Sequence, residues 1–207
     1  LPFASQNPGF MHACGHDGHI AILLGAVALL KKEPLPAKLV FIFQPGEEGG
    51  AGAKCMVEAG VLNGVEAIFA CHLDPHFMLG QISLQPGPVT AFTERFTIEV
   101  KGRGGHAARP HEAVDAIVVA SSMVLALQTI VSRQTDPTIP AVVSIGQIEA
   151  GTAFNAIAAT AFLKGTIRTT DPKIMRKIKA NMSGIVQKTA SMHRAEAALR
   201  FEGGYPA

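Results

Sequence analysis

The stretch KLVFIFQPGEEGG, residues 38–50, begins as a continuous apolar run and ends in a glycine-rich loop that carries two adjacent glutamates. Such a run is typical of a strand that is covered on both faces of a sheet. Residues 51–60 predict a short helix, and residues 65–71, VEAIFAC, predict a second buried strand. Strand, helix and strand in this order predict a parallel pair with a right-handed crossover. The region therefore belongs to an α/β sheet whose two strands end at the same edge.

Polar side chains follow both predicted strands at this edge. Glu47 and Glu48 come after the first strand, and His72 comes directly after the second. Ligands of open α/β sheets gather at the carboxyl ends of the strands. Adjacent carboxylates in an extended chain point in opposite directions, so one could bind a metal while the other faces the water on that metal. A solvated glutamate pair in a loop and a structural histidine at a strand end are the alternatives.

A cluster of possible metal ligands precedes the strands, in MHACGHDGH, residues 11–19. Cys14 and His16 lie two positions apart in a loop that contains glycine, and thiolate and imidazole suit zinc and similar divalent metals. Taken singly, His12 and His19 could cap or pack locally and Cys14 could simply be buried. Taken together, the group favours metal binding or catalysis, because unpaired buried polar groups are costly. The following segment IAILLGAVALLKK is apolar almost all round and predicts a buried helix.

The second half of the chain has a different pattern, in which short alternating segments are separated by long helices. The expected strands are 95–101, 141–151, 159–169 and 195–203, and the expected helices are 111–131 and 171–194. Asp171 and Pro172 are typical of the start of the last helix. The order βαββαβ is the ferredoxin-like arrangement, with two helices over one face of an antiparallel sheet. We therefore expect two domains, a parallel-strand α/β region over 1–89 and the βαββαβ domain over 90–207.

Composition limits the possible partners. Of 207 residues, 48% are hydrophobic and 16% charged, the formal net charge is +2, and no run of Lys or Arg exceeds two residues. Nothing here indicates nucleic acid or a membrane surface, and no apolar run approaches the ~20 residues of a membrane-spanning helix. The three widely spaced cysteines form no disulfide framework and suggest a reducing compartment, the cytoplasm. Of these, Cys55 and Cys71 are expected in the core. The chain opens without Met and ends in mid-pattern, so we expect a fragment.

Five motifs resemble one enzyme family in their order along the chain. They are MHACGHDGH, QPGEEGGAGAKCMVEAG, HLDP, GRGGHAARPH and GTAFNAIAATAFLKGTIRT. Together they resemble the dinuclear amidohydrolase branch of the aminoacylase-type metallopeptidase superfamily, which includes hippurate hydrolases, N-acetyl-diaminopimelate deacetylases and indole-acetyl-amino-acid hydrolases. The resemblance implies part of a metallopeptidase catalytic domain followed by a ferredoxin-like lid domain that forms a homodimer. It also implies cleavage of the amide bond of a small N-acyl amino acid.

The resemblance assigns roles to the polar residues of the first region. It implies that Cys14, His16, Glu48 and His72 hold two divalent metal ions, which could be zinc, manganese, cobalt or nickel. It implies that Glu47 is the general base.

Three residues of the second region also match family positions. In related enzymes a histidine in the motif that contains His106 reaches the partner subunit's active site and steadies the carbonyl oxygen of the substrate. Asn155 resembles a position near the substrate. Arg168 could clamp a substrate carboxylate bidentately. On sequence alone, the alternatives are a surface histidine on a glycine-rich turn and a structural salt bridge.

Two other functions compete with this hypothesis. Cys14 could be the nucleophile of a cysteine hydrolase with His16 as its base. Residues two apart on a short loop rarely align in this way, and the glutamate pair would then have no role. Alternatively, the chain is a non-catalytic dimerising fragment. Family members continue with a second half of the catalytic domain that carries a further histidine ligand, so the chain holds four of five expected ligands.

Overall fold

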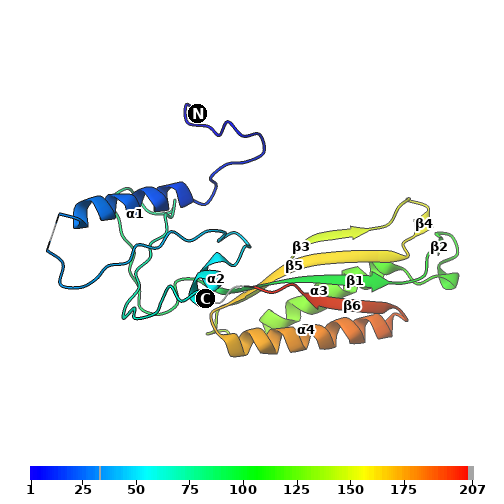
Figure 1. Ribbon diagram of the computed structural model, residues 1–207. Coiled ribbons are helices and arrows are strands. Elements are labelled where there is room, and N and C mark those ends of the chain that lie inside the picture. Colours follow the sequence, from blue (N-terminus) through cyan, green and yellow to red (C-terminus); the bar gives the residue numbers. More distant parts are fainter. Residues whose placement is uncertain (33, 205–207) are drawn as a thin grey trace. The chain divides into compact units, whose positions relative to one another are not determined.

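The computed structural model describes residues 1–32 and 34–204. It divides the chain into two compact units, Leu1–Leu84 and Gln85–Ala207, which are described here separately. Figure 1 shows the two long helices and the sheet of the second unit, and the helices and loops of the first.

The second unit is built on a four-stranded antiparallel sheet with the strand order β3-β5-β1-β6. Both helices lie on one side of this sheet (Figure 1). The main elements follow in the predicted order βαββαβ, and the strand order is that of the ferredoxin-like arrangement. They are β1 (Phe92–Lys101), α3 (Ala116–Gln134), β3 (Ala141–Ala150), β5 (Thr160–Thr169), α4 (Pro172–Met192) and β6 (Glu196–Phe201).

The hydrophobic core of the described residues lies between this sheet and its two helices. Every second residue of β1 from Phe96 to Val100 is buried, as the alternating sequence predicts. On α4, Ile178 and Met182, which are four residues apart and so share one helix face, lie in the core, with Ile174 packed at its margin. The two-residue period of the strand and the helical spacing of the apolar residues therefore match the faces that are buried.

Both helices begin at an aspartate whose side chain accepts a backbone N–H. Asp171 Oδ1 accepts from Lys173 N at 2.6 Å at the start of α4, as predicted. The helix expected from residue 111 begins later, because Asp115 caps α3 and residues Pro110–Glu112 form a short 3-10 helix, η1. By length and mean hydropathy, 1.6, α3 could cross a membrane, but one side of it forms the core of this unit.

Two short strands and a loop extend one end of the second unit (Figure 1). The strands β2 (Gly105–His106) and β4 (Ala156–Ile157) pair antiparallel, with His106 opposite Ala156. They bring together the two glycine-rich motifs of this half of the sequence.

The first unit contains the helices α1 (His16–Leu30) and α2 (Gly52–Glu58). The second ends at Glu58, and just past its end Gly60 N donates to Val57 O and Val61 N donates to Met56 O. This pair of bonds is a Schellman motif, and the φ of Gly60, 88°, is the left-handed conformation that it requires.

Several expectations for the first unit were wrong. Residues 38–43 and 65–71 form no strand pairing in the structure, although both are apolar. The helix α1 has no buried residue, and Cys55 and Cys71 are exposed instead of lying in a core. A strand exists only through hydrogen bonds to a neighbour, and burial on both faces needs a layer on each side. The described part of this unit supplies two helices and loops, so the apolar runs have neither neighbours nor cover.

Candidate metal centre

Three segments that are far apart in sequence converge in the first unit. The possible ligand atoms of Cys14, His16 and His72 all lie within 4.8 Å of one another. The same is true of His16, Glu47 and Glu48, so His16 belongs to both groups. Within these groups, Cys14 Sγ lies 3.6 Å from His72 Nε2, and His16 Nε2 lies 3.6 Å from Glu47 Oε2. The five residues that the resemblance assigns to the metal site therefore lie in one cluster, although the described residues of this unit form no parallel sheet edge there.

The beginning of α1 positions the first two residues of the cluster. Gly15, with φ 74°, precedes His16, the first residue of α1. The left-handed conformation at this position suits glycine, because it has no Cβ to clash. The helix was expected from residue 20, so the structure places the second and third histidines of the motif in its first turn.

A tight turn positions the two glutamates. Gly50 N donates to Gly46 O at 3.0 Å and Gly49 N donates to Glu47 O at 2.7 Å. The chain is therefore curled here, and the extended conformation assumed from the sequence was wrong. Because of this turn, both carboxylates lie close to His16 and do not diverge to opposite sides.

The ring of His72 is oriented by its own neighbour in sequence. His72 Nδ1 lies 2.7 Å from the carbonyl oxygen of Leu73. A carbonyl can only accept, so Nδ1 carries the proton and, in the neutral ring, Nε2 keeps its lone pair. That lone pair belongs to the nitrogen closest to Cys14 Sγ. A metal-binding histidine commonly donates its other ring N–H to a carbonyl in this way.

The local charges disfavour a nucleophilic thiolate. Partial removal of the Cys14 thiol from water raises its pKa, and the negative charge and hydrogen bond of Glu48 and the negative charge of Glu47 raise it further. Nucleophilic cysteines have lowered pKa values instead. Cys14 Sγ lies 3.6 Å from His72 Nε2, so the thiol has an imidazole partner other than the proposed base His16. A bound divalent cation would reverse the effect, since a thiol that coordinates a metal loses its proton.

The donor set fits a divalent transition metal. Thiolate, imidazole and carboxylate are the three ligand types that zinc takes, and the same set serves manganese, cobalt and nickel. Two overlapping groups of three residues, which share His16, fit two neighbouring ions better than one.

One histidine of the cluster was missed by sequence reasoning. The rings of His19 and His72 lie 4.4 Å apart between centroids, and His19 Nε2 accepts a hydrogen bond from Leu73 N at 3.0 Å. Partial removal of the His19 ring from water lowers its pKa, and the neighbouring imidazoles of His72 and His16 lower it further. The lowered pKa favours the neutral form of His19. Local capping or packing was only the alternative for His19 taken singly, and no sequence pattern reveals a contact across 54 positions.

In the second unit, the structure brings His106 and Asn155 together. Ala107 N donates to the carbonyl oxygen of Asn155 at 3.2 Å, beside the short β2–β4 ladder. Ala108 N donates to His106 Nδ1 at 3.1 Å. A backbone N–H can only donate, so in the neutral ring the proton lies on Nε2. The exposed His106 therefore presents an N–H donor to the surroundings.

Arg168 lies at the other end of the same sheet. It pairs with Thr93 near the start of β1 and with Val142 near the start of β3. Asn155 precedes β5 and Arg168 is close to its end, which at ~3.3 Å per residue separates them by roughly 25 Å. The structure therefore does not bring Arg168 to His106 and Asn155 within one chain.

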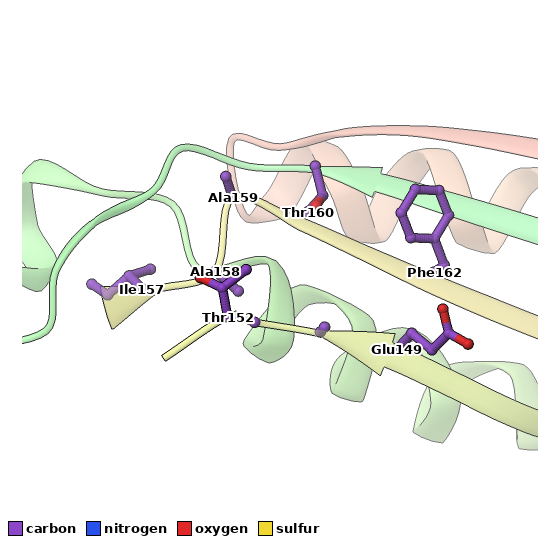
Figure 2. Close-up of a pocket in the computed structure, with 9 residues that line it drawn as sticks. Glu149, Thr152, Ile157, Ala158, Ala159, Thr160 and Phe162 are labelled. Carbon is purple, nitrogen blue, oxygen red and sulfur yellow. The ribbon is translucent and has the colours of Figure 1, made fainter. Parts of the chain in front are cut away.

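A hollow of about 310 Å³ lies near the His106 end of this unit (Figure 2). Glu149 on β3 and Phe162 on β5, which are cross-strand partners, line one side, and Ile157 on β4 lines the other. None of the predicted site residues lines it.

Comparison with known proteins shows that the chain belongs to a family. Residues 1–191 match the sequence family described as Peptidase family M20/M25/M40. The chain is 40% identical, over 100% of its length and 50% of the relative, to an N-acetyl-L-cysteine deacetylase of Bacillus subtilis. It is 47% identical, over 90% of its length and 50% of the relative, to an N-acetyldiaminopimelate deacetylase of Bacillus velezensis.

A plant relative and a solved crystal structure match the chain as well. An IAA-amino acid hydrolase of Arabidopsis thaliana is 43% identical over 95% of this chain and 45% of its own. The crystal structure of a dinuclear metal-binding peptidase of the M20 family from Bacillus subtilis matches with a TM-score of 0.77 and 37% identity. That match covers 100% of this chain and 52% of the other. The chain thus spans about half the length of the curated relatives it matches.

Proposed function

The chain belongs to the peptidase family M20/M25/M40, and from this premise we propose that the whole protein is a metal-dependent amidohydrolase that cleaves N-acyl amino acids. The observation that carries the proposal is the convergence of Cys14, His16, His72 and two glutamates from three separate segments. The names of the relatives, two deacetylases and an IAA-amino acid hydrolase, support the same substrate class. Residues 1–89 would then be part of the catalytic domain and 90–207 the lid domain.

In this proposal the side chains of the cluster divide two tasks. Cys14, His16, Glu48 and His72 hold the metals, and Glu47 takes a proton from the attacking water and passes it to the leaving amine. Two divalent cations, drawn from zinc, manganese, cobalt or nickel, would supply an activated water and a Lewis acid.

The residues of the second unit would contact the substrate. The Nε2–H of His106 donates to the carbonyl oxygen as negative charge develops there, with Asn155 beside it, and Arg168 pairs with the substrate carboxylate. Because roughly 25 Å of β5 separates Arg168 from the other two, one substrate cannot touch all three within one chain. A homodimer in which one subunit supplies His106 and Asn155 and the other supplies Arg168 removes this difficulty.

The proposed setting is the cytoplasm, which the three free cysteines support because exposed thiols persist in a reducing compartment.

The test uses the polypeptide encoded by the complete open reading frame. Hydrolysis of a panel of N-acetyl amino acids would be followed before and after dialysis against a chelator. We expect activity to disappear with the metal and to return when zinc or manganese is added back. Hydrolysis that survives the chelator but is lost on thiol alkylation would contradict the proposal and indicate a cysteine hydrolase. No hydrolysis of any panel member with metal bound would favour a non-catalytic role.

A further inference from the structure

We propose that His19 is a positioning residue that fixes the imidazole of His72 through the backbone of Leu73. The inference rests on the proposed function, because it takes His72 to be a metal ligand. Its starting point is the hydrogen bond of 3.0 Å that Leu73 N donates to His19 Nε2. This bond ties the first turn of α1 to the segment that carries His72.

The hydrogen bond separates the role of His19 from that of a ligand. The Nε2 lone pair is occupied by the Leu73 N–H, so this nitrogen is not free to coordinate a cation. The two groups of residues that could hold a metal both leave His19 out. The Nε2 atom of His19 therefore binds the backbone of Leu73 and does not coordinate an ion.

Leu73 passes this restraint on to His72. Its N–H is held by His19, and its carbonyl oxygen accepts the His72 Nδ1–H at 2.7 Å. The rings of His19 and His72 also pack edge to face, with an interplanar angle of 68°. Turning the His72 ring away from Cys14 would break this arrangement, so the Nε2 lone pair is held in place before any metal arrives.

Two glycines of the histidine motif make room for the Leu73 side chain. A Cβ at Gly18 would overlap the Cδ1 methyl of Leu73, and a Cβ at Gly15 would lie 3.2 Å from the Leu73 Cβ. Gly25, further along the same helix, faces open space. The two glycines of CGHDGH therefore leave the space that the Leu73 side chain occupies, which lets Leu73 N come close enough to donate to His19 Nε2.

The experiment measures zinc affinity of the whole protein by competition with a chromophoric chelator. Residues that orient a metal ligand typically change metal affinity about 10- to 100-fold when removed. We expect His19→Ala to weaken zinc binding about tenfold or more. His19→Gln, whose amide oxygen can accept the Leu73 N–H, should restore most of the affinity. The control is His12→Ala, which removes an exposed histidine of the same motif and should leave the affinity unchanged.

A second readout follows Leu73 in the metal-free protein. Exchange of the Leu73 amide hydrogen should be faster in His19→Ala and slow again in His19→Gln. The absorption spectrum of bound Co²⁺ should keep its thiolate band in both variants, because Cys14 is untouched. Unchanged zinc affinity in His19→Ala would overturn the inference. Loss of a whole equivalent of zinc in both His19 variants would also overturn it, since that result identifies a direct ligand.

A matched glycine pair tests the inference if His19→Ala does not fold. Gly18→Ala and Gly25→Ala make the same change in one helix, but only the first meets Leu73. Weaker zinc binding in Gly18→Ala alone supports the inference, and equal affinities in the two variants overturn it. If the wild-type protein binds no zinc, manganese, cobalt or nickel, the proposed function is wrong, and this inference, which rests on it, is wrong as well.

Discussion

At the scale of the residue, the role of each side chain in the metal cluster depends more on which of its atoms donate and which accept hydrogen bonds than on its spacing in the sequence. The sequence predicted which side chains gather, from the histidine motif and the glutamate pair, although the strands expected beside them do not form. It could not predict which ring nitrogen of His72 is free, since this depends on a carbonyl group. It also misjudged the glutamate pair, because the turn at Gly46 curls a segment that was expected to be extended.

The division of roles between Glu47 and Glu48 is a prediction at this scale. Glu47→Gln in the whole protein should keep its metal and lower turnover by about 10²- to 10⁴-fold, the usual contribution of a general base. Glu48→Gln should lose metal, because a neutral amide is a poorer ligand than a carboxylate. Metal content by elemental analysis and kcat would be measured side by side. Equal loss of metal in the two variants would mean that both glutamates are ligands.

At the scale of the element, the main elements of the second unit were predictable, whereas the strands and the buried helix expected in the first unit were not. The four long strands and two long helices after residue 90 carry their own periodicity, so local sequence was sufficient to predict them, but it did not predict η1 or the short pair β2 and β4. Residues 38–43 and 65–71 are as apolar as real core strands, but hydrophobicity does not say whether a neighbouring strand is present. The exposed surface of α1 has the same origin, because burial is a property of what packs against a helix.

The cap of α4 gives a stability prediction. Asp171→Ala removes the acceptor of the Lys173 N–H and should lower the free energy of unfolding by about 1 kcal/mol. Asp171→Asn keeps an acceptor of similar capping strength and should be nearly neutral. Denaturant unfolding of the whole protein, followed by a signal from the second unit, measures both. If alanine and asparagine cost the same, the charge of Asp171 rather than its hydrogen bond is what stabilises the helix.

At the scale of the whole molecule, the active site is expected to be shared between two subunits. His106 and Asn155 lie at one end of the second unit and Arg168 at the other, so a single chain presents them in different places. This separation could not be seen in the sequence, where GTAFN and GTIRT are parts of one motif. It follows from β5, which runs between them as one unbroken strand.

Subunit mixing tests this arrangement. His106→Ala in the whole protein should lower turnover roughly a hundredfold or more, with metal content unchanged, because one donor to the developing oxyanion is lost. Mixing it with Glu47→Gln should restore up to about a quarter of the wild-type activity, since half of randomly exchanged dimers are hybrids with one intact site. Mixing it with Arg168→Ala should restore activity in the same way, because those two residues would come from different subunits. Mixing it with Asn155→Ala should restore nothing, since His106 and Asn155 would reach the same site from one subunit. No recovery in any mixture, with subunit exchange verified, would rule out a site shared across the dimer.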